Sequence, residues 1–220
     1  MRVLARLCLA ALLSLACVPA MSRHHGPRDV DDATPGVFDY YLLSLSWSPN
    51  YCLTHQDDRA QCGSKGLGFV LHGLWPQFDG GDYPQYCQGE QSLSAQAAAL
   101  GQTIYPSPKL VQHEWQSHGT CSGLGAVNYF KTADRALASL QVPSMLEAPL
   151  RSLTLSAAQI VAAFRSANPG LPENSLTVAC SHGQLSEVRI CLTRELALRT
   201  CGARVGSTCP DGPVEVRSSR

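Results

Sequence analysis

The sequence predicts an α+β fold in which a central antiparallel β-sheet packs with several α-helices and is stapled by disulfides. β-Rich segments lie at 37–49 and 175–192, whereas helical patterns gather between 93 and 168. No internal repeat or low-complexity tract divides the chain, and an even number of cysteines remains once a predicted leader is removed. We therefore expect one domain over residues 37–220.

Residues 1–20 have the composition of a secretory signal peptide. Arg2 and Arg6 precede an apolar run that ends in V-P-A, and the run is too short and wrongly flanked for a membrane span. We expect cleavage after Ala20 and a secreted or periplasmic protein with no membrane attachment. A lipoprotein signal with Cys17 as the lipidated residue is the alternative, which the preceding S-L-A fits poorly.

The polar, Gly- and Pro-containing segment 21–36 predicts a flexible N-terminal arm. His24 and His25 lie in it, and we interpret them as a solvated tail rather than as metal ligands.

The charge balance excludes a protein that coats nucleic acid non-specifically. Without the leader, 15 basic residues face 17 acidic ones, so the net charge is near −2. No basic stripe could drive general phosphate binding, so any polyanion must be held locally.

Eight cysteines remain beyond the leader, which indicates disulfides formed in an oxidising compartment. Their number alone does not fix the connectivity. Short spacing favours Cys52–Cys62, nested pairs Cys180–Cys209 and Cys191–Cys201 would tie a C-terminal hairpin, and Cys87–Cys121 would then remain.

Local patterns predict the elements in chain order. A first core strand lies in 37–49, and a buried strand at 67–72 precedes a long Gly-, Pro- and Gln-rich loop at 76–91. Strand patterns at 175–180 and 185–192 flank S-H-G-Q as a hairpin. Four helices are expected at 93–105, 108–118, 126–140 and 156–168, the second opened by Ser107-Pro108 and the fourth by a Ser156/Gln159 capping box.

The stretch H-E-W-Q-S-H at 113–118 resembles a zinc-protease motif but has a different spacing. Such a motif places its histidines four residues apart on one helix face, and here the step is five. On a regular helix, His113 and His118 would lie about 140° apart, which disfavours a shared metal ion. Glu114 and His118 would share a face, so the spacing favours a carboxylate close to one histidine.

The second chemical stretch is F-V-L-H-G-L-W-P-Q at 69–77. We expect His72 to end a strand and Gly73 to let the backbone turn sharply. Alone, His72 could be a structural histidine and Trp75 a core residue. Two histidines from different elements suit a general acid and a general base, and a neighbouring aromatic suits a stacked nucleobase.

Together these stretches resemble the two active-site segments of the ribonuclease T2 family, and LSLSWSPNYC at 43–52 resembles that family's first core strand. The resemblance covers about residues 37–210, includes the four cysteine pairs above, and is closest in length and leader to bacterial members. It implies a cofactor-free, metal-independent endoribonuclease that is often monomeric. Its substrate would be single-stranded RNA, cleaved through a 2′,3′-cyclic phosphate, whereas DNA lacks the nucleophilic 2′-OH.

The resemblance also implies residue roles. His118 corresponds to the general base, His72 to the general acid, His113 to a phosphate-binding histidine and Glu114 to a carboxylate that polarises the phosphoryl group or tunes its neighbours. The family usually has lysine where this chain has Ser117, so part of the charge stabilisation is missing, and Lys109 is a candidate replacement.

The implied base pocket contains Trp75 as the stacking aromatic, with Tyr83 closing the stack or simply exposed on its loop. Gln77 stands where some members have an aspartate that selects the base, and an amide both donates and accepts. Trp115 is expected in the core, and His55 and His182 at the surface.

Two other classes of function compete with the ribonuclease. One is a binding protein on the same scaffold that has lost catalysis, for which Ser117 is the only support. The other is a zinc hydrolase, which the five-residue step disfavours.

Overall fold

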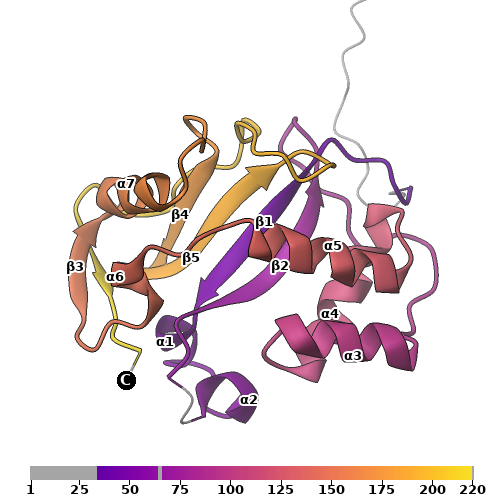
Figure 1. The fold of residues 1–220 in the computed structure, drawn as a ribbon, viewed down its shortest axis with the longest axis horizontal. Helices are drawn as coiled ribbons and strands as arrows, with labels where there is room; N and C mark the ends of the chain where they lie inside the picture. Colours follow the sequence, from indigo (N-terminus) through magenta and orange to yellow (C-terminus); the bar gives the residue numbers. More distant parts are fainter. Residues whose placement is uncertain (1–33, 64–65, 220) are drawn as a thin grey trace, which may run out of the picture.

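The computed structural model describes residues 34–63 and 66–219, so the predicted signal peptide and most of the predicted arm lie outside it. The described residues form a mixed fold around one six-stranded sheet, which confirms the predicted fold class (Figure 1). The strands are β1 (Tyr40–Trp47), β2 (Phe69–Gln77), β3 (Leu153–Ser156), β4 (Leu176–Ser181), β5 (Gln184–Leu192) and β6 (Pro213–Val216). The helices are α1 (Ser48–Tyr51), α2 (Arg59–Cys62), α3 (Ala95–Ile104), α4 (Pro108–Ser117), α5 (Ala126–Ala138), α6 (Ser144–Glu147) and α7 (Ala157–Ala167), with a 3-10 turn at Gly119–Ser122.

The sheet has the order β2-β1-β5-β6-β3, and β4 pairs with β5 along the edge opposite β1. All pairings are antiparallel except the one between β5 and β6, which meet in parallel at Gln184 and Glu215. β1 therefore lies between β2 and β5, and any contact between side chains of those two strands has to pass over it.

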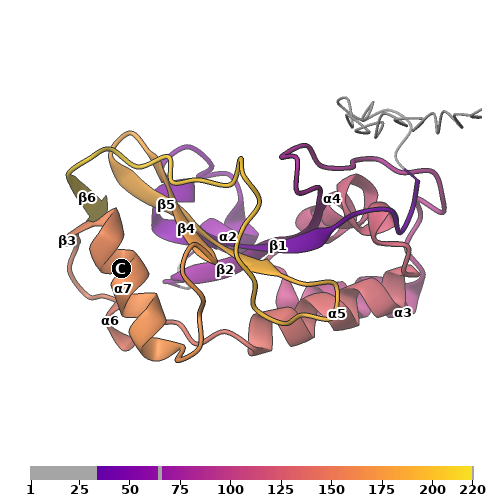
Figure 2. The same cartoon turned by 90° about the horizontal axis from the view of Figure 1, so that it is seen from above.

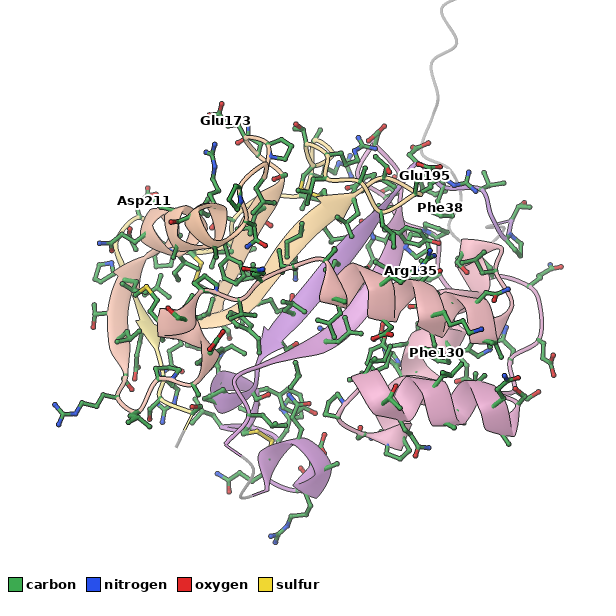
Figure 3. The ribbon with its side chains drawn as sticks, in the orientation of Figure 1. Phe38, Phe130, Arg135, Glu173, Glu195 and Asp211 are labelled. Carbon is green, nitrogen blue, oxygen red and sulfur yellow. A yellow bond between two sulfur atoms is a disulfide. The ribbon has the colours of Figure 1, made fainter. Side chains whose placement is uncertain are left out.

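The two faces of β1 differ in character because successive side chains of a strand point to opposite faces. Leu43, Leu45 and Trp47 enter the main core, whereas Ser44 and Ser46 face the other way. Figure 2 shows α3 and α5 running along one side of the sheet. Phe130, labelled between α5 and α3 in Figure 3, belongs to the same core as the leucines of β1. One face of β1 thus packs on the main core, whereas the other carries Ser44 and Ser46 next to a smaller apolar cluster of Tyr40, Leu42 and Cys191.

Several predicted local signals are confirmed. Ser107 caps α4 and Pro108 is its first residue, while Ser156 and Gln159 form the capping box of α7. The β4–β5 hairpin turns at His182 and Gly183, both with positive φ, as the primed two-residue turns of hairpins require.

Two predicted element boundaries are wrong, and two short strands were not predicted. The second strand does not end at His72 but continues to Gln77, because pairing with β1 persists along its whole length. The helix predicted to reach residue 118 ends at Ser117. Two four-residue strands, β3 and β6, were not predicted, since so short a segment carries little periodicity.

Among the described residues, no helix combines the length and the apolar character needed to cross a membrane.

Disulfides join Cys52 to Cys62, Cys87 to Cys121, Cys180 to Cys209 and Cys191 to Cys201. These are the four pairs that the spacing and the family resemblance imply. The Cys87–Cys121 bond closes 34 residues and ties the loop after β2 to the 3-10 turn that follows α4.

We predict unequal costs for removing two of these bonds. A disulfide stabilises mainly by restricting the unfolded chain, and the effect grows with loop length. Replacing both Cys87 and Cys121 by alanine should lower the free energy of unfolding by about 4 kcal/mol, against about 3 kcal/mol for the ten-residue Cys52–Cys62 loop. Urea unfolding of the oxidised proteins measures both, and a larger loss for the shorter loop would contradict the prediction.

Candidate active site

His72 lies at a β-bulge in β2. The register pairs Ser44 with Gly73 and Leu45 with Leu71, so it skips His72. An extra residue in a strand has no cross-strand partner, and it re-aims its side chain. The His72 side chain is 34% exposed, in a strand whose neighbouring Leu71 and Gly73 are buried.

Gly73 allows β2 to approach α4 closely, rather than providing the predicted sharp turn. A Cβ atom at this position would collide with Trp75 Nε1 and Glu114 Oε2. In its absence, Trp75 Nε1 donates a hydrogen bond of 2.8 Å to Glu114 Oε2. This bond joins the strand that carries His72 to the helix that carries the other candidate residues.

α4 presents its motif residues in different directions. Glu114 is fully buried, and the adjacent His113 has a 54% exposed side chain. Trp115 lies in the core as predicted, where its Nε1 donates to the carbonyl of Glu90. After Ser117 the backbone leaves the helical path, because His118 has φ −128° and ψ −44°.

α4 ends before His118, and this affects the argument from spacing against a bound metal ion. Donor atoms of His113, Glu114 and His118 lie within 4.8 Å of one another and could hold an ion. The expectation that the spacing disfavours a shared ion assumed a regular helix through His118, whereas α4 ends at Ser117.

The two histidine-bearing segments meet around Trp75. Its ring centroid lies 4.9 Å from that of His72 and 5.2 Å from that of His118. The His113 and His118 rings are 6.4 Å apart. The structure thus brings together all four residues predicted to act on the substrate, His72, His113, Glu114 and His118.

Burial and neighbouring charges shift the pKa values of His118 and His72 in opposite directions. Burial, helped by the positive charges of His113 and His72, lowers the pKa of His118 to about 3. Burial also opposes the charged form of His72, but its hydrogen bond with Glu187 and the charges of Glu187 and Glu114 raise its pKa above the usual value. One imidazole is therefore neutral over a pH range in which the other is charged.

Glu114 is a carboxyl group held away from water. Burial raises its pKa to about 7, although the charge of His72 and the Trp75 hydrogen bond act in the opposite direction. Its Oε2 accepts from Trp75, and its buried Oε1 has no hydrogen-bond partner among the residues that the structure describes. A protonated Glu114 could donate from Oε1 to a bound anion.

Sequence reasoning missed Glu187 and Arg189 on β5. His72 Nδ1 lies 2.6 Å from Glu187 Oε1, and Arg189 Nη2 lies 2.6 Å from Glu187 Oε2. In the sequence the two residues alternate with apolar ones, which is typical of a solvated strand face. Only the strand order, with β1 between β2 and β5, reveals that this face meets His72.

The predicted base-pocket residues differ in accessibility. Tyr83 is 42% exposed, with its ring centroid 6.4 Å from that of His118, and Trp75 is partly buried beside it. Gln77 is buried, and its amide nitrogen donates to the carbonyl of Pro76. A base contact by Gln77 would require its side chain to leave that position.

A groove of about 910 Å³ extends from His72 and His113 along α1, α2 and the β4–β5 hairpin. His55 and His182 are exposed as predicted, and both line this groove. His55 stacks on Tyr51 with ring centroids 4.0 Å apart. His24 and His25 lie outside the described residues.

Comparison with known proteins identifies relatives. The model of the Ribonuclease T2 family matches residues 38–201. A ribonuclease of Aeromonas hydrophila is 38% identical over 164 residues, 73% of this chain and 74% of the relative. Ribonuclease DdI of Dictyostelium discoideum is 29% identical and covers 96% of this chain and 98% of its own.

Solved structures share the fold. An RNase-related protein from Calystegia sepium covers 83% of this chain and 98% of its own, with a TM-score of 0.67 and 24% identity. RNase NT in complex with 5′-AMP covers 82% of this chain and 98% of its own, with a TM-score of 0.61 and 24% identity.

We predict that Glu114→Gln gains stability relative to the wild type as the pH rises. The pKa of folded Glu114 lies above its ordinary value of 4.5, so the stability tied to its proton is complete below pH 4.5 and is lost as the pH rises to about 7. Glutamine does not titrate, so the variant loses no stability at this position as the pH rises. Relative to the wild type, the variant should gain about 3 kcal/mol of unfolding free energy between pH 4.5 and pH 8.

Urea unfolding at the two pH values measures this gain. The matched control is Glu195→Gln, which changes an exposed carboxylate at the surface (Figure 3) and should keep the wild-type pH dependence. Parallel pH dependence in Glu114→Gln and the wild type would contradict a buried, titrating Glu114.

Proposed function

This chain belongs to the ribonuclease T2 family and is a T2-type endoribonuclease, and from that premise we propose that it cleaves single-stranded RNA without a metal ion. His118 is the general base and His72 the general acid. The observation that carries this assignment is that Glu187 Oε1 lies 2.6 Å from His72 Nδ1, whereas the buried Nδ1 of His118 has no partner among the described residues. The pKa values of the two rings shift in opposite directions accordingly, which favours a charged His72 and a neutral His118.

The proposed reaction is an internal transphosphorylation. Neutral His118 removes the proton of the ribose 2′-OH, and the oxygen attacks the adjacent phosphorus. The bond from phosphorus to the 5′-oxygen breaks, and His72 supplies the proton that this oxygen needs as it leaves. The products are a 2′,3′-cyclic phosphate and a 5′-OH. Water can later open the ring to a 3′-phosphate with the two histidines in exchanged roles.

The developing charge on the phosphoryl oxygens needs nearby donors. We assign this role to Glu114, donating from Oε1 when protonated, and to His113. Ser117 cannot replace the lysine usual at its position, because it is 1% exposed and its Oγ lies 3.4 Å from His113 Nδ1. Lys109 is exposed on the groove that His113 lines, and its charge contributes to lowering the pKa of His113.

We propose that the chain binds RNA on both sides of the histidines. Trp75 and Tyr83 would stack the base upstream of the cleaved bond. The groove beside His72 and His113 would take the nucleotide that leaves. Gln77 would join the base pocket only after its side chain turns out, so base preference is expected to depend mainly on stacking.

We also propose that the protein is exported and acts as a monomeric single domain after loss of residues 1–20. Four disulfides support an oxidising compartment. The signal-peptide composition of the leader supports the same route.

The decisive experiment uses purified, oxidised protein and a single-stranded oligoribonucleotide in excess EDTA, with product ends identified by mass. We expect fragments that end in a 2′,3′-cyclic phosphate. His118→Ala should lower kcat/KM by about 10²- to 10⁴-fold, because the 2′-OH loses its base. An oligonucleotide with one 2′-deoxynucleotide should resist cleavage only at the bond that follows it.

Each contrary result has a defined meaning. Loss of cleavage in EDTA, restored by zinc, would assign the donor cluster of His113, Glu114 and His118 to a metal-dependent hydrolase. Intact RNA under all conditions, with retained RNA binding, would indicate a scaffold that has lost catalysis with its lysine. Cleavage at the 2′-deoxy position would exclude transphosphorylation.

A further inference from the structure

The carboxylate of Glu187 reaches His72 across an intervening strand. Neighbouring strands lie about 4.8 Å apart, so β5 and β2 are separated by roughly twice that distance. On β1, Ser46 stands opposite Glu187, and Ser44 stands opposite Arg189. These small side chains leave room for Glu187 Oε1 to come within 2.6 Å of His72 Nδ1.

Arg189 holds the other oxygen of the same carboxylate. It follows Glu187 by two positions, so both side chains point to the same face of β5. Arg189 Nε and Nη2 lie 2.8 Å and 2.6 Å from Glu187 Oε2. Each carboxylate oxygen therefore has its own partner, and the side chain of Glu187 is only 12% exposed.

Glu187 remains an anion over the working range of the site. Burial alone would raise its pKa, but the hydrogen bond with His72 and the charge of Arg189 lower the pKa to about 2. An ionised acceptor at Nδ1 fixes the imidazole tautomer and ring plane, because the Nδ1 proton has to point at the carboxylate.

We propose that Glu187, held by Arg189, is a positioning residue for RNA cleavage: it orients the His72 ring so that its Nε2–H faces the leaving 5′-oxygen, and its negative charge keeps that ring protonated. This rests on the proposed role of His72 as general acid. An aspartate plays the corresponding part toward histidine in serine-protease triads, where it orients the ring without taking its proton.

The chain supplies a matched control for this pair. E-V-R occurs at 187–189 on β5 and again at 215–217 on β6. Arg217 lies 3.7 Å from Glu215 in the second copy, and Glu215 accepts a hydrogen bond from Gln184 rather than from a histidine. Glu215→Gln therefore removes a comparable carboxylate that is not bonded to His72.

The first test compares two leaving groups. A dinucleotide leaves a ribose alkoxide that needs a proton, whereas a uridine 3′-(4-nitrophenyl phosphate) releases a stable phenolate that does not. We expect Glu187→Gln to lower kcat/KM for the dinucleotide by about 10-fold or more, and for the nitrophenyl ester by less than about 3-fold. Glu215→Gln should leave both values unchanged.

His72→Ala separates failure of this inference from failure of the proposed function. Suppose that His72→Ala lowers kcat/KM only for the dinucleotide, whereas Glu187→Gln lowers it equally for both substrates. That result would overturn the positioning role of Glu187 and leave the general-acid role of His72 intact. Equal losses on both substrates in His72→Ala would overturn the general-acid assignment itself. Unfolding curves for every variant, with Glu215→Gln as reference, identify a loss that reflects folding.

The second test uses pH and a conservative replacement. His72 faces Glu187 and Arg189 from β5, and Glu114 and His113 from α4, and His118 follows that helix. Removing the Glu187 charge should shift the alkaline limb of kcat/KM to lower pH. Glu187→Asp keeps the charge, whereas Glu187→Gln keeps the shape. The alkaline limb of Glu187→Asp should therefore lie closer to that of the wild type than the limb of Glu187→Gln does. The inference would be overturned if Glu187→Gln lay closer to the wild type than Glu187→Asp, or if the alkaline limb of Glu187→Gln did not shift.

Discussion

The hydrogen bond between Trp75 and Glu114 is the contact on which the site depends. It joins β2 to α4 at a close approach that requires glycine at position 73, because a Cβ atom there would collide with both side chains. β2 carries His72 and α4 leads directly into His118, so this bond, together with the contact between the Trp75 and His118 rings, fixes how far apart the two histidines lie. The same bond satisfies one oxygen of a buried carboxyl group and leaves the other free to meet a substrate.

Around this contact, burial and charge divide the histidines between two roles. Within the described part of the chain, no carboxylate is hydrogen-bonded to the His118 ring, and burial together with the positive charges of His113 and His72 keeps this ring neutral. His72 is also removed from water, but an anion on β5 compensates for the cost of its charge. A general base and a general acid thus arise from one residue type, and the strand order determines which histidine receives the carboxylate.

Sequence reasoning captured what is local and missed what depends on assembly. Caps such as Ser107 and Ser156, the hairpin at His182 and the histidines of the two motifs follow from short patterns. The bulge at His72 does not follow from a short pattern. It arises because β2 has one more residue than β1 at this point of their pairing, which neither strand shows by itself. Glu187 could not be recognised from the sequence for the same reason. It alternates with apolar residues, which is typical of a solvent-facing strand, and only the strand order shows that its side chain reaches His72 across β1.

Direct observation of both imidazoles tests the central claim best. In the free, ¹⁵N-labelled wild-type protein, titration of the ring nitrogens by NMR reports the charge of each histidine, with assignments from His72→Ala and His118→Ala. At pH 5 the account predicts a charged His72 and a neutral His118, whose pKa is about 3. Two histidines titrating together near the ordinary value of 6.5 would contradict it.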